Sequence, residues 1–85
     1  MADHRLVYVT APNCHLCEHG REVVDRLAAE KGFAVEEIAW DSERATALIE
    51  RDGVALPPAL YLGEDLVGFG RLSERRLRKL LREAA

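Results

Sequence analysis

The chain opens with a strand pattern that changes at once into a helix pattern and then back into a strand pattern. Residues 6–10 are β-branched, aromatic or aliphatic, which predicts a short strand buried on both faces. From residue 14 apolar side chains recur at helical spacing as far as Gly32, with Gly20 as a small local cost in helix propensity. Residues 33–40 are strand-like again. Such a strand–helix–strand unit requires a crossover between parallel strands, so it predicts an α/β fold.

The middle of the chain predicts a second helix followed by a hairpin. Asp41 or Ser42 can cap a helix that ends at Gly53. Two strand-like runs follow, separated by a Gly-Glu pair that favours a tight turn, and they span residues 59–62 and 65–68. This hairpin adds an antiparallel edge to the sheet.

The end of the chain predicts a last helix, which Ser73 can cap. Its apolar stripe, expected in the core, consists of Leu77, Leu80 and Leu81, and its arginines point mostly outward. The order of elements is therefore βαβαββα, a four-stranded mixed sheet with helices on both faces.

Composition limits the size of the core and the kinds of partner. With 85 residues, 48% of them apolar, we expect one small domain over residues 1–85 and a monomer. Twelve basic against fifteen acidic residues give a net charge of −3, which offers no electrostatic reason to bind nucleic acid. No apolar stretch approaches the roughly 20 residues of a membrane span, and the start shows no signal-peptide core. We therefore expect a cytoplasmic protein that binds neither nucleic acid nor membrane.

The two cysteines of the chain, Cys14 and Cys17, lie at the predicted junction of the first strand and helix. A disulfide stabilises mainly by closing a loop of the unfolded chain, and a two-residue gap closes almost nothing. The pair is therefore more typical of a redox or metal site. Because unpaired N–H groups and the helix dipole favour a thiolate at a helix start, we expect Cys14 to be the nucleophile. Cys17, one turn later, would resolve the mixed disulfide.

Metal binding is an alternative use of the same segment. Cys14, His15, Cys17 and His19 are four potential zinc ligands within six residues. A second ligand pair is missing, because His4 is the one remaining histidine, so zinc or an iron–sulfur cluster would have to be held across a dimer. The protein would then be a non-catalytic binding module. A third reading is a folded interaction domain whose cysteines do not turn over.

The order βαβαββα, the Cys-x-x-Cys at the first strand-to-helix junction and a proline before the third strand resemble the thioredoxin fold. Within it, the closest resemblance is to the compact glutaredoxin-like group. The run from Thr10 to Glu18, with Cys-His-Leu-Cys inside it, is similar to the active sites of a bacterial glutaredoxin-like branch. The resemblance covers residues 6–81. It implies a thiol–disulfide oxidoreductase that acts on protein disulfides, with the redox-active disulfide Cys14–Cys17 and no bound cofactor.

The resemblance also implies a substrate-binding surface around the dithiol. A cis proline faces the dithiol in thioredoxin-like folds, and the family spacing points to Pro58 rather than Pro57, with a trans Pro-Pro loop as the alternative. His15 either favours the Cys14 thiolate when protonated or is a solvent-exposed residue without a role. The expected substrate-binding residues are His15, Leu16, Pro57, Pro58 and Phe69.

Two departures from the family's pattern weaken the case for glutathione as the reductant. Glutaredoxins that use glutathione commonly carry a lysine three residues before the first cysteine, where this chain has Ala11. They also carry an acidic pair after a Gly-Gly turn, where residues 68–73 of this chain include Arg71 and no carboxylate. Arg71 and the nearby backbone could still bind a carboxylate. The expected electron donor is a thioredoxin-reductase-like flavoprotein or another protein thiol.

Overall fold

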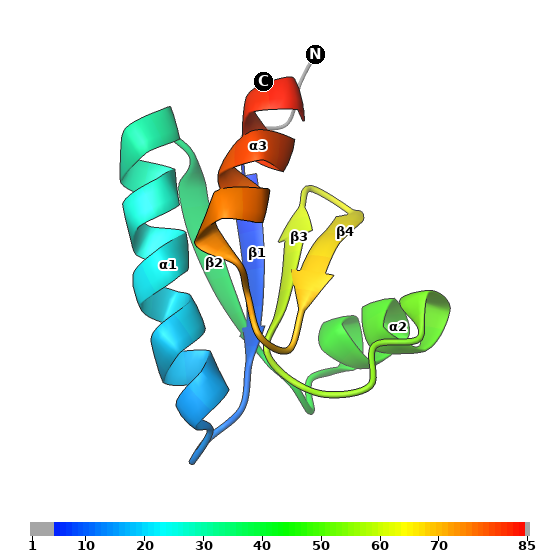
Figure 1. Ribbon diagram of the computed structural model, residues 1–85. Helices are drawn as coiled ribbons and strands as arrows, with labels where there is room; N and C mark the ends of the chain where they lie inside the picture. Colours follow the sequence, from blue (N-terminus) through cyan, green and yellow to red (C-terminus); the bar gives the residue numbers. More distant parts are fainter. Residues whose placement is uncertain (1–4, 85) are drawn as a thin grey trace.

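The computed structural model describes residues 5–84 and contains the predicted elements in the predicted order (Figure 1). The first four residues lie outside the described part. They include His4 and most of the segment that was searched for a signal peptide. No helix in the described part is long and apolar enough to cross a membrane. The elements are β1 (Arg5–Thr10), α1 (His15–Lys31), β2 (Ala34–Ala39), α2 (Glu43–Asp52), β3 (Ala59–Leu62), β4 (Asp65–Phe69) and α3 (Glu74–Ala84).

The four strands form one mixed sheet in the order β2-β1-β3-β4. β1 is parallel to β2 and antiparallel to β3, and β3 and β4 form the predicted antiparallel hairpin. α1 and α3 pack on one face of the sheet and α2 packs on the other (Figure 1). The prediction of a mixed sheet with helices on both faces is confirmed.

The central strand β1 supplies side chains to two apolar cores, one on each face of the sheet. Leu6 and Tyr8 point toward α1 and α3, whereas Val7 and Val9 point toward α2. All four side chains are fully buried, as the run of strand-forming residues predicted. A strand buried on both faces cannot shift its register by one residue without exchanging its two faces. The end of β1, and the loop that carries the cysteines, are thereby fixed.

The first two helices begin and end at residues that the sequence marks. Ser42, rather than Asp41, caps α2, because its Oγ accepts the backbone N–H of Ala45 at 3.2 Å. Gly32 and Gly53 end α1 and α2 in the left-handed conformation, with φ of 73° and 65°. Glycine adopts this conformation without steric cost, which is why both helices stop there.

The apolar stripe of α3 is narrower than expected. Leu77 and Leu81 are buried in the core shared with α1 and the sheet. Leu80 is only half-buried, so the expectation that it belongs to the core was wrong. Leu80 lies about 100° around the helix from Leu81, which turns it toward the edge of the buried face. The predicted cap is confirmed, since the Ser73 Oγ accepts a backbone N–H of the first turn at 3.2 Å.

Candidate active site

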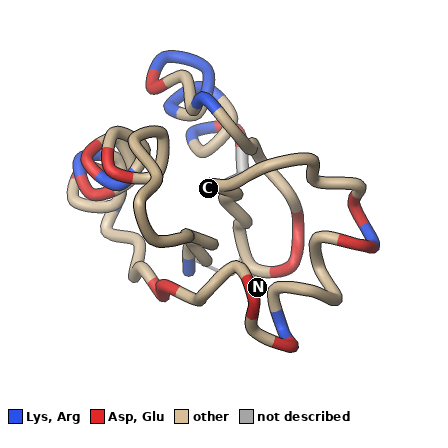
Figure 2. Tube along the Cα trace, turned by 90° about the horizontal axis from the view of Figure 1, so that it is seen from below, with Lys and Arg blue, Asp and Glu red and all other residues tan. Residues whose placement is uncertain are grey.

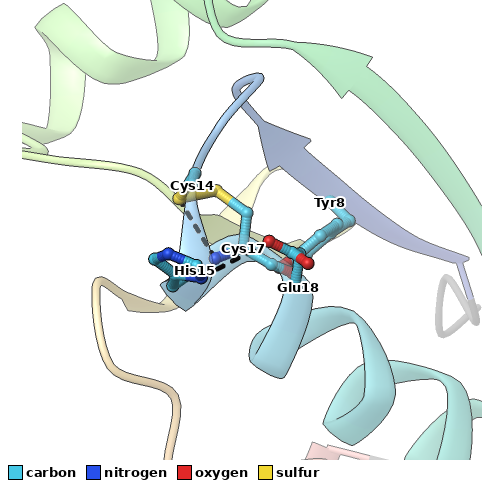
Figure 3. Close-up of a disulfide and its surroundings, with 5 residues drawn as sticks. All are labelled: Tyr8, Cys14, His15, Cys17 and Glu18. Carbon is cyan, nitrogen blue, oxygen red and sulfur yellow. Dashed lines mark hydrogen bonds and ion pairs between the residues drawn. A yellow bond between two sulfur atoms is a disulfide. The ribbon is translucent and has the colours of Figure 1, made fainter.

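Cys14 and Cys17 form a disulfide at the start of α1, where the chain leaves β1 (Figure 3). Their Cα atoms lie 5.1 Å apart, within the usual range for a disulfide. Asn13, directly before the pair, has a φ of 54°. Asparagine adopts this left-handed conformation more readily than most residues, and here it turns the chain from the loop into the helix.

The two sulfur atoms lie in different surroundings. Cys14 is the N-cap of α1 and is half-buried, and its Sγ accepts the backbone N–H of Cys17 at 3.1 Å. Cys17 is 4% exposed. When the disulfide is reduced, the N–H donor and the positive end of the helix dipole both favour negative charge on the sulfur of Cys14. Cys14 is the more accessible sulfur and Cys17 the covered one.

Tyr8 supports the first turn of α1 from the core. Its ring is fully buried, and its hydroxyl donates to the backbone carbonyl of Cys17 at 2.5 Å (Figure 3). Burial raises the pKa of Tyr8 to about 12, so the hydroxyl remains protonated and able to donate at neutral pH. The structure places Tyr8 on the α1 face of β1, but the strand pattern gives no sign of this or that its hydroxyl reaches the active-site turn. Sequence analysis therefore missed this residue.

Gly20 allows this close approach of β1 and α1. A Cβ at position 20 would lie 2.6 Å from the hydroxyl oxygen of Tyr8, and 3.2 and 3.3 Å from side-chain carbons of Leu72 and Pro58. The first of these distances is impossible without movement, and the other two are tighter than ordinary contacts. The glycine is therefore a packing requirement rather than a tolerated loss of helix propensity.

A hollow lies beside the disulfide on the side of β2. Its charged lining consists of Glu18, Arg21 and Glu37, and Arg21 is ion-paired with both Glu37 and Asp25. The rest of the lining comes from Tyr8, Thr10, Ala11, Asn13 and the two cysteines. Sequence analysis did not single out these charges, because they reach the hollow from two separate elements.

The loop before β3 and the end of β4 bring the other predicted site residues to the same end of the sheet as the disulfide (Figure 1). The Pro57–Pro58 peptide bond is cis, as the family spacing indicated. Pro58 is fully buried and packs toward α1 at Gly20, whereas Pro57 is half-buried. The backbone N–H of Gly70 donates to the carbonyl of Pro58 at 2.7 Å, which joins the two loops. Phe69, directly before Gly70, is exposed.

Leu56 is an additional apolar residue at this end that sequence analysis missed. It is 43% exposed and lies over Gly70, while Phe69 is 40% exposed. Among residues 5–84 these are the large apolar side chains with the greatest exposure. An apolar residue directly before a Pro-Pro pair was a weak signal that could have found it. Together, Leu56 and Phe69 form a small apolar surface over the cis-proline loop.

His15 and Leu16, the residues between the cysteines, differ in exposure. The ring of His15 is fully exposed and its Nδ1 lies 3.7 Å from a carboxylate oxygen of Glu18 (Figure 3). Leu16 is half-buried. Within the described residues, no group of three or more histidine, cysteine or acidic side chains lies close enough together to hold a metal ion.

Several solved structures resemble this chain over nearly its whole length. A mutant thioredoxin from Halobacterium salinarum NRC-1 is 26% identical, with a TM-score of 0.67 over 94% of this chain and 73% of that one. An uncharacterised thioredoxin-like protein from Clostridium perfringens is 12% identical, with a TM-score of 0.71 over 95% and 70%. Glutaredoxin 1 from Francisella tularensis, complexed with cacodylate, is 11% identical, with a TM-score of 0.54 over 93% of each chain. No protein-family model and no curated protein sequence matches the chain.

The chain therefore has the thioredoxin-like fold. Its cysteine pair lies at the start of the first helix and stands at disulfide distance. The similarity to thioredoxins and this pair together support a redox role in thiol–disulfide chemistry.

Proposed function

We propose that the protein is a glutaredoxin-like thiol–disulfide oxidoreductase in which Cys14 is the nucleophile and Cys17 the resolving thiol. The difference between the two sulfurs supports this assignment. The half-buried sulfur of Cys14 accepts a backbone N–H at the helix start, and Cys17 is buried behind it. An incoming disulfide therefore meets Cys14 first.

The reaction transfers two electrons from the dithiol to the substrate disulfide. Cys14 and Cys17 each release one proton to solvent, and the two substrate thiolates take up two. The thiolate of Cys14 attacks one substrate sulfur, the substrate S–S bond breaks, and the first substrate thiolate leaves and takes up a proton. The thiol of Cys17 then loses its proton and attacks the sulfur of Cys14 in the mixed disulfide. The second substrate thiolate leaves and is protonated, and the Cys14–Cys17 disulfide remains. Both steps exchange one S–S bond for another, so no further oxidant is needed.

The substrate binds over the apolar surface beside the disulfide. Leu16, Pro57 and Phe69 were expected there, and Leu56 adds to them. Pro57 has a carbonyl but no N–H to offer to a bound peptide. His15, exposed next to Cys14, adds a positive charge that favours the thiolate when its ring is protonated.

The electron donor in this proposal is a thioredoxin-reductase-like flavoprotein or another protein thiol. Ala11 lines the hollow beside the disulfide and supplies no cation for a carboxylate of glutathione. Arg71 and Arg76 line the groove beside Phe69, so the ammonium of glutathione would meet positive charge there. Such a like-charge contact acts against one ligand without favouring another in particular.

Single cysteine variants test the assignment of the two thiols. Cys17→Ser should trap a mixed disulfide with a protein substrate, and Cys14→Ser should not. Cys14, measured in the Cys17→Ser variant, should also be alkylated by iodoacetamide faster at neutral pH than Cys17 in the Cys14→Ser variant. If Cys17 is alkylated faster than Cys14, the nucleophile and the resolving thiol are the reverse of those proposed. Elemental analysis of the purified protein provides the control, because bound zinc or iron and no disulfide reduction would favour the binding-module reading.

An NADPH-coupled assay tests the donor. It is run once with glutathione and glutathione reductase and once with thioredoxin reductase, both reductases coming from the same source as the protein. We expect turnover with the flavoprotein and little with glutathione. Saturable turnover with glutathione alone would refute the proposed donor while leaving the dithiol chemistry intact.

A further inference from the structure

Half of the basic residues are held in ion pairs, and most of the others gather on α3. Of the twelve basic residues, six arginines pair with carboxylates, and they are Arg5, Arg21, Arg26, Arg44, Arg51 and Arg78. Lys31 ends α1. The remaining five are exposed and make no ion pair within residues 5–84, and they are Arg71, Arg75, Arg76, Lys79 and Arg82. We call these five side chains the α3 basic surface.

The α3 basic surface covers the outer side of α3 and the loop that precedes it. Figure 2 shows that Lys and Arg segments predominate on α3, whereas α1 and α2 carry the two signs more evenly. Leu77 and Leu81 anchor the inner side of the helix in the core. Arg75 and Lys79 are four residues apart on the helix, a spacing at which like charges repel. No ion pair within the described residues neutralises these cations.

The surface continues toward the candidate active site. A groove between β4 and the start of α3 is lined by Arg71 and Arg76 together with Phe69. The remaining lining includes Leu66, Val67, Leu72 and Leu77. Phe69 is exposed and directly precedes Gly70, whose backbone N–H donates to the carbonyl of Pro58. Positive charge and exposed apolar surface therefore lie side by side at the end of the sheet that carries the disulfide.

We infer that the α3 basic surface and Phe69 dock an acidic segment of the protein that exchanges its disulfide with Cys14. This inference rests on the proposed function. Carboxylates of the partner would face the five cations, and an apolar partner residue would rest on Phe69. Charge complementarity of this kind raises the association rate and selects among partners.

The same surface fits nucleic acid and membranes less well. The fifteen acidic residues give the chain a net charge of −3, which disfavours binding of a long polyanion. A membrane-bound helix needs a free apolar side, and the buried leucines of α3 are committed to the core. A short acidic protein segment needs only the outer side of α3 and the groove beside it.

Two matched variants separate the α3 basic surface from general charge. Arg75→Gln with Lys79→Gln removes two positive charges from the outer side of α3. Thr46→Glu with Ala47→Glu adds two negative charges at exposed positions of α2, on the opposite face of the sheet. Both double variants change the net charge from −3 to −5, since each alters it by two.

Binding is measured first, without any redox step. The ¹⁵N-labelled oxidised protein is titrated with the cysteine-free peptide Glu-Glu-Leu-Glu-Glu, with its Lys-for-Glu analogue and with an oligothymidylate. We expect the acidic peptide to shift amide signals of residues 69–82, and the lysine analogue to leave them in place. Shifts spread over other elements, equal shifts with both peptides, or stronger binding of the oligothymidylate would overturn the inference.

Reduction rates then connect docking to chemistry. The reduced protein is mixed with a disulfide of the acidic peptide extended by cysteine, with the lysine counterpart, and with the neutral small molecule 2-hydroxyethyl disulfide. We expect Arg75→Gln with Lys79→Gln to lower the ratio of acidic-peptide rate to neutral rate by roughly fivefold at low salt, and the α2 variant to leave it unchanged. An unchanged ratio in the α3 variant refutes docking. If the reduced protein reduces none of the three disulfides, the proposed function is refuted instead, and the peptide titration still tests docking.

Discussion

Replacing Gly20 by alanine tests how closely α1 packs onto the strand beneath the disulfide. Alanine is favoured over glycine inside a helix by about 1 kcal/mol. Against this, the new Cβ would lie 2.6 Å from the Tyr8 hydroxyl oxygen, about 0.8 Å closer than the 3.4 Å of an ordinary contact. The buried ring cannot swing away without breaking its hydrogen bond to Cys17. Overpacking of this kind costs about 1–3 kcal/mol, so Gly20→Ala should destabilise the protein by about 0–2 kcal/mol despite its better helix propensity.

The Tyr8→Phe substitution should relieve this clash. On its own it removes one buried hydrogen bond to the Cys17 carbonyl and should cost about 1 kcal/mol. In the Phe background the nearest atoms to the new Cβ are the side-chain carbons of Leu72 and Pro58, at 3.2 and 3.3 Å, which small shifts can accommodate. The double variant should therefore be more stable than the sum of the single variants by about 1–2 kcal/mol.

Urea denaturation of the oxidised proteins, followed by circular dichroism, measures the four stabilities of this cycle. Ala29→Gly, at an exposed position of α1, serves as the control that reports helix propensity in the same helix without packing. Two results would refute the reasoning. One is a Gly20→Ala protein that is more stable by the full propensity gain. The other is additivity of the two substitutions within about 0.5 kcal/mol.

Three further predictions concern stability. Leu81→Ala should cost about 2–5 kcal/mol and Leu80→Ala clearly less, because only Leu81 is fully buried; equal denaturation midpoints would contradict this. Burial raises the pKa of Tyr8 and of Tyr61 to about 12. The free energy of unfolding should therefore be unchanged below pH 10 and fall by on the order of 3 kcal/mol per tyrosine between about pH 10 and 12; tyrosinate absorbance of the folded protein at pH 10 would contradict this. The guanidinium groups of Arg26 and Arg78 lower the pKa of the Glu74 carboxyl to about 2, so its stabilising effect should be present above pH 4.5 and lost toward pH 2. Glu74→Gln should therefore reduce the loss of unfolding free energy between pH 4.5 and 2; an unchanged loss would show that the two ion pairs contribute nothing.

The elements and the cysteine junction could be predicted because their signals are local. Strand and helix periods occupy neighbouring residues, and caps such as Ser42, Gly32 and Gly53 act within one turn. The position of Cys14 at the N-cap follows from the point where the period changes. Each of these features depends on a few consecutive residues, so the sequence shows them directly.

The support beneath the disulfide could not be predicted in the same way. The hydrogen bond from the Tyr8 hydroxyl to the Cys17 carbonyl depends on how closely α1 packs on the sheet. The role of Gly20 depends on three side chains from separate parts of the chain. Leu80 shows the same limit, because a helical stripe does not reveal how wide the buried face is. Packing distances of a few tenths of an ångström decide these features, and a sequence pattern carries no such distance.

The pairing of charges is another feature that the sequence does not reveal, and it determines which part of the surface is left positive. Helical spacing alone would pair Arg26 with Glu22, but its hydrogen bonds are with Glu74, 48 residues away. Arg78 similarly reaches back to Glu30 on α1 while also holding Glu74. These bonds join α1 to α3 and use up the one arginine of α3 that faces α1. The other cations of α3 make no ion pair in the described part of the chain. A helix that is rich in arginine in sequence therefore divides into one structural arginine and an unpaired basic surface.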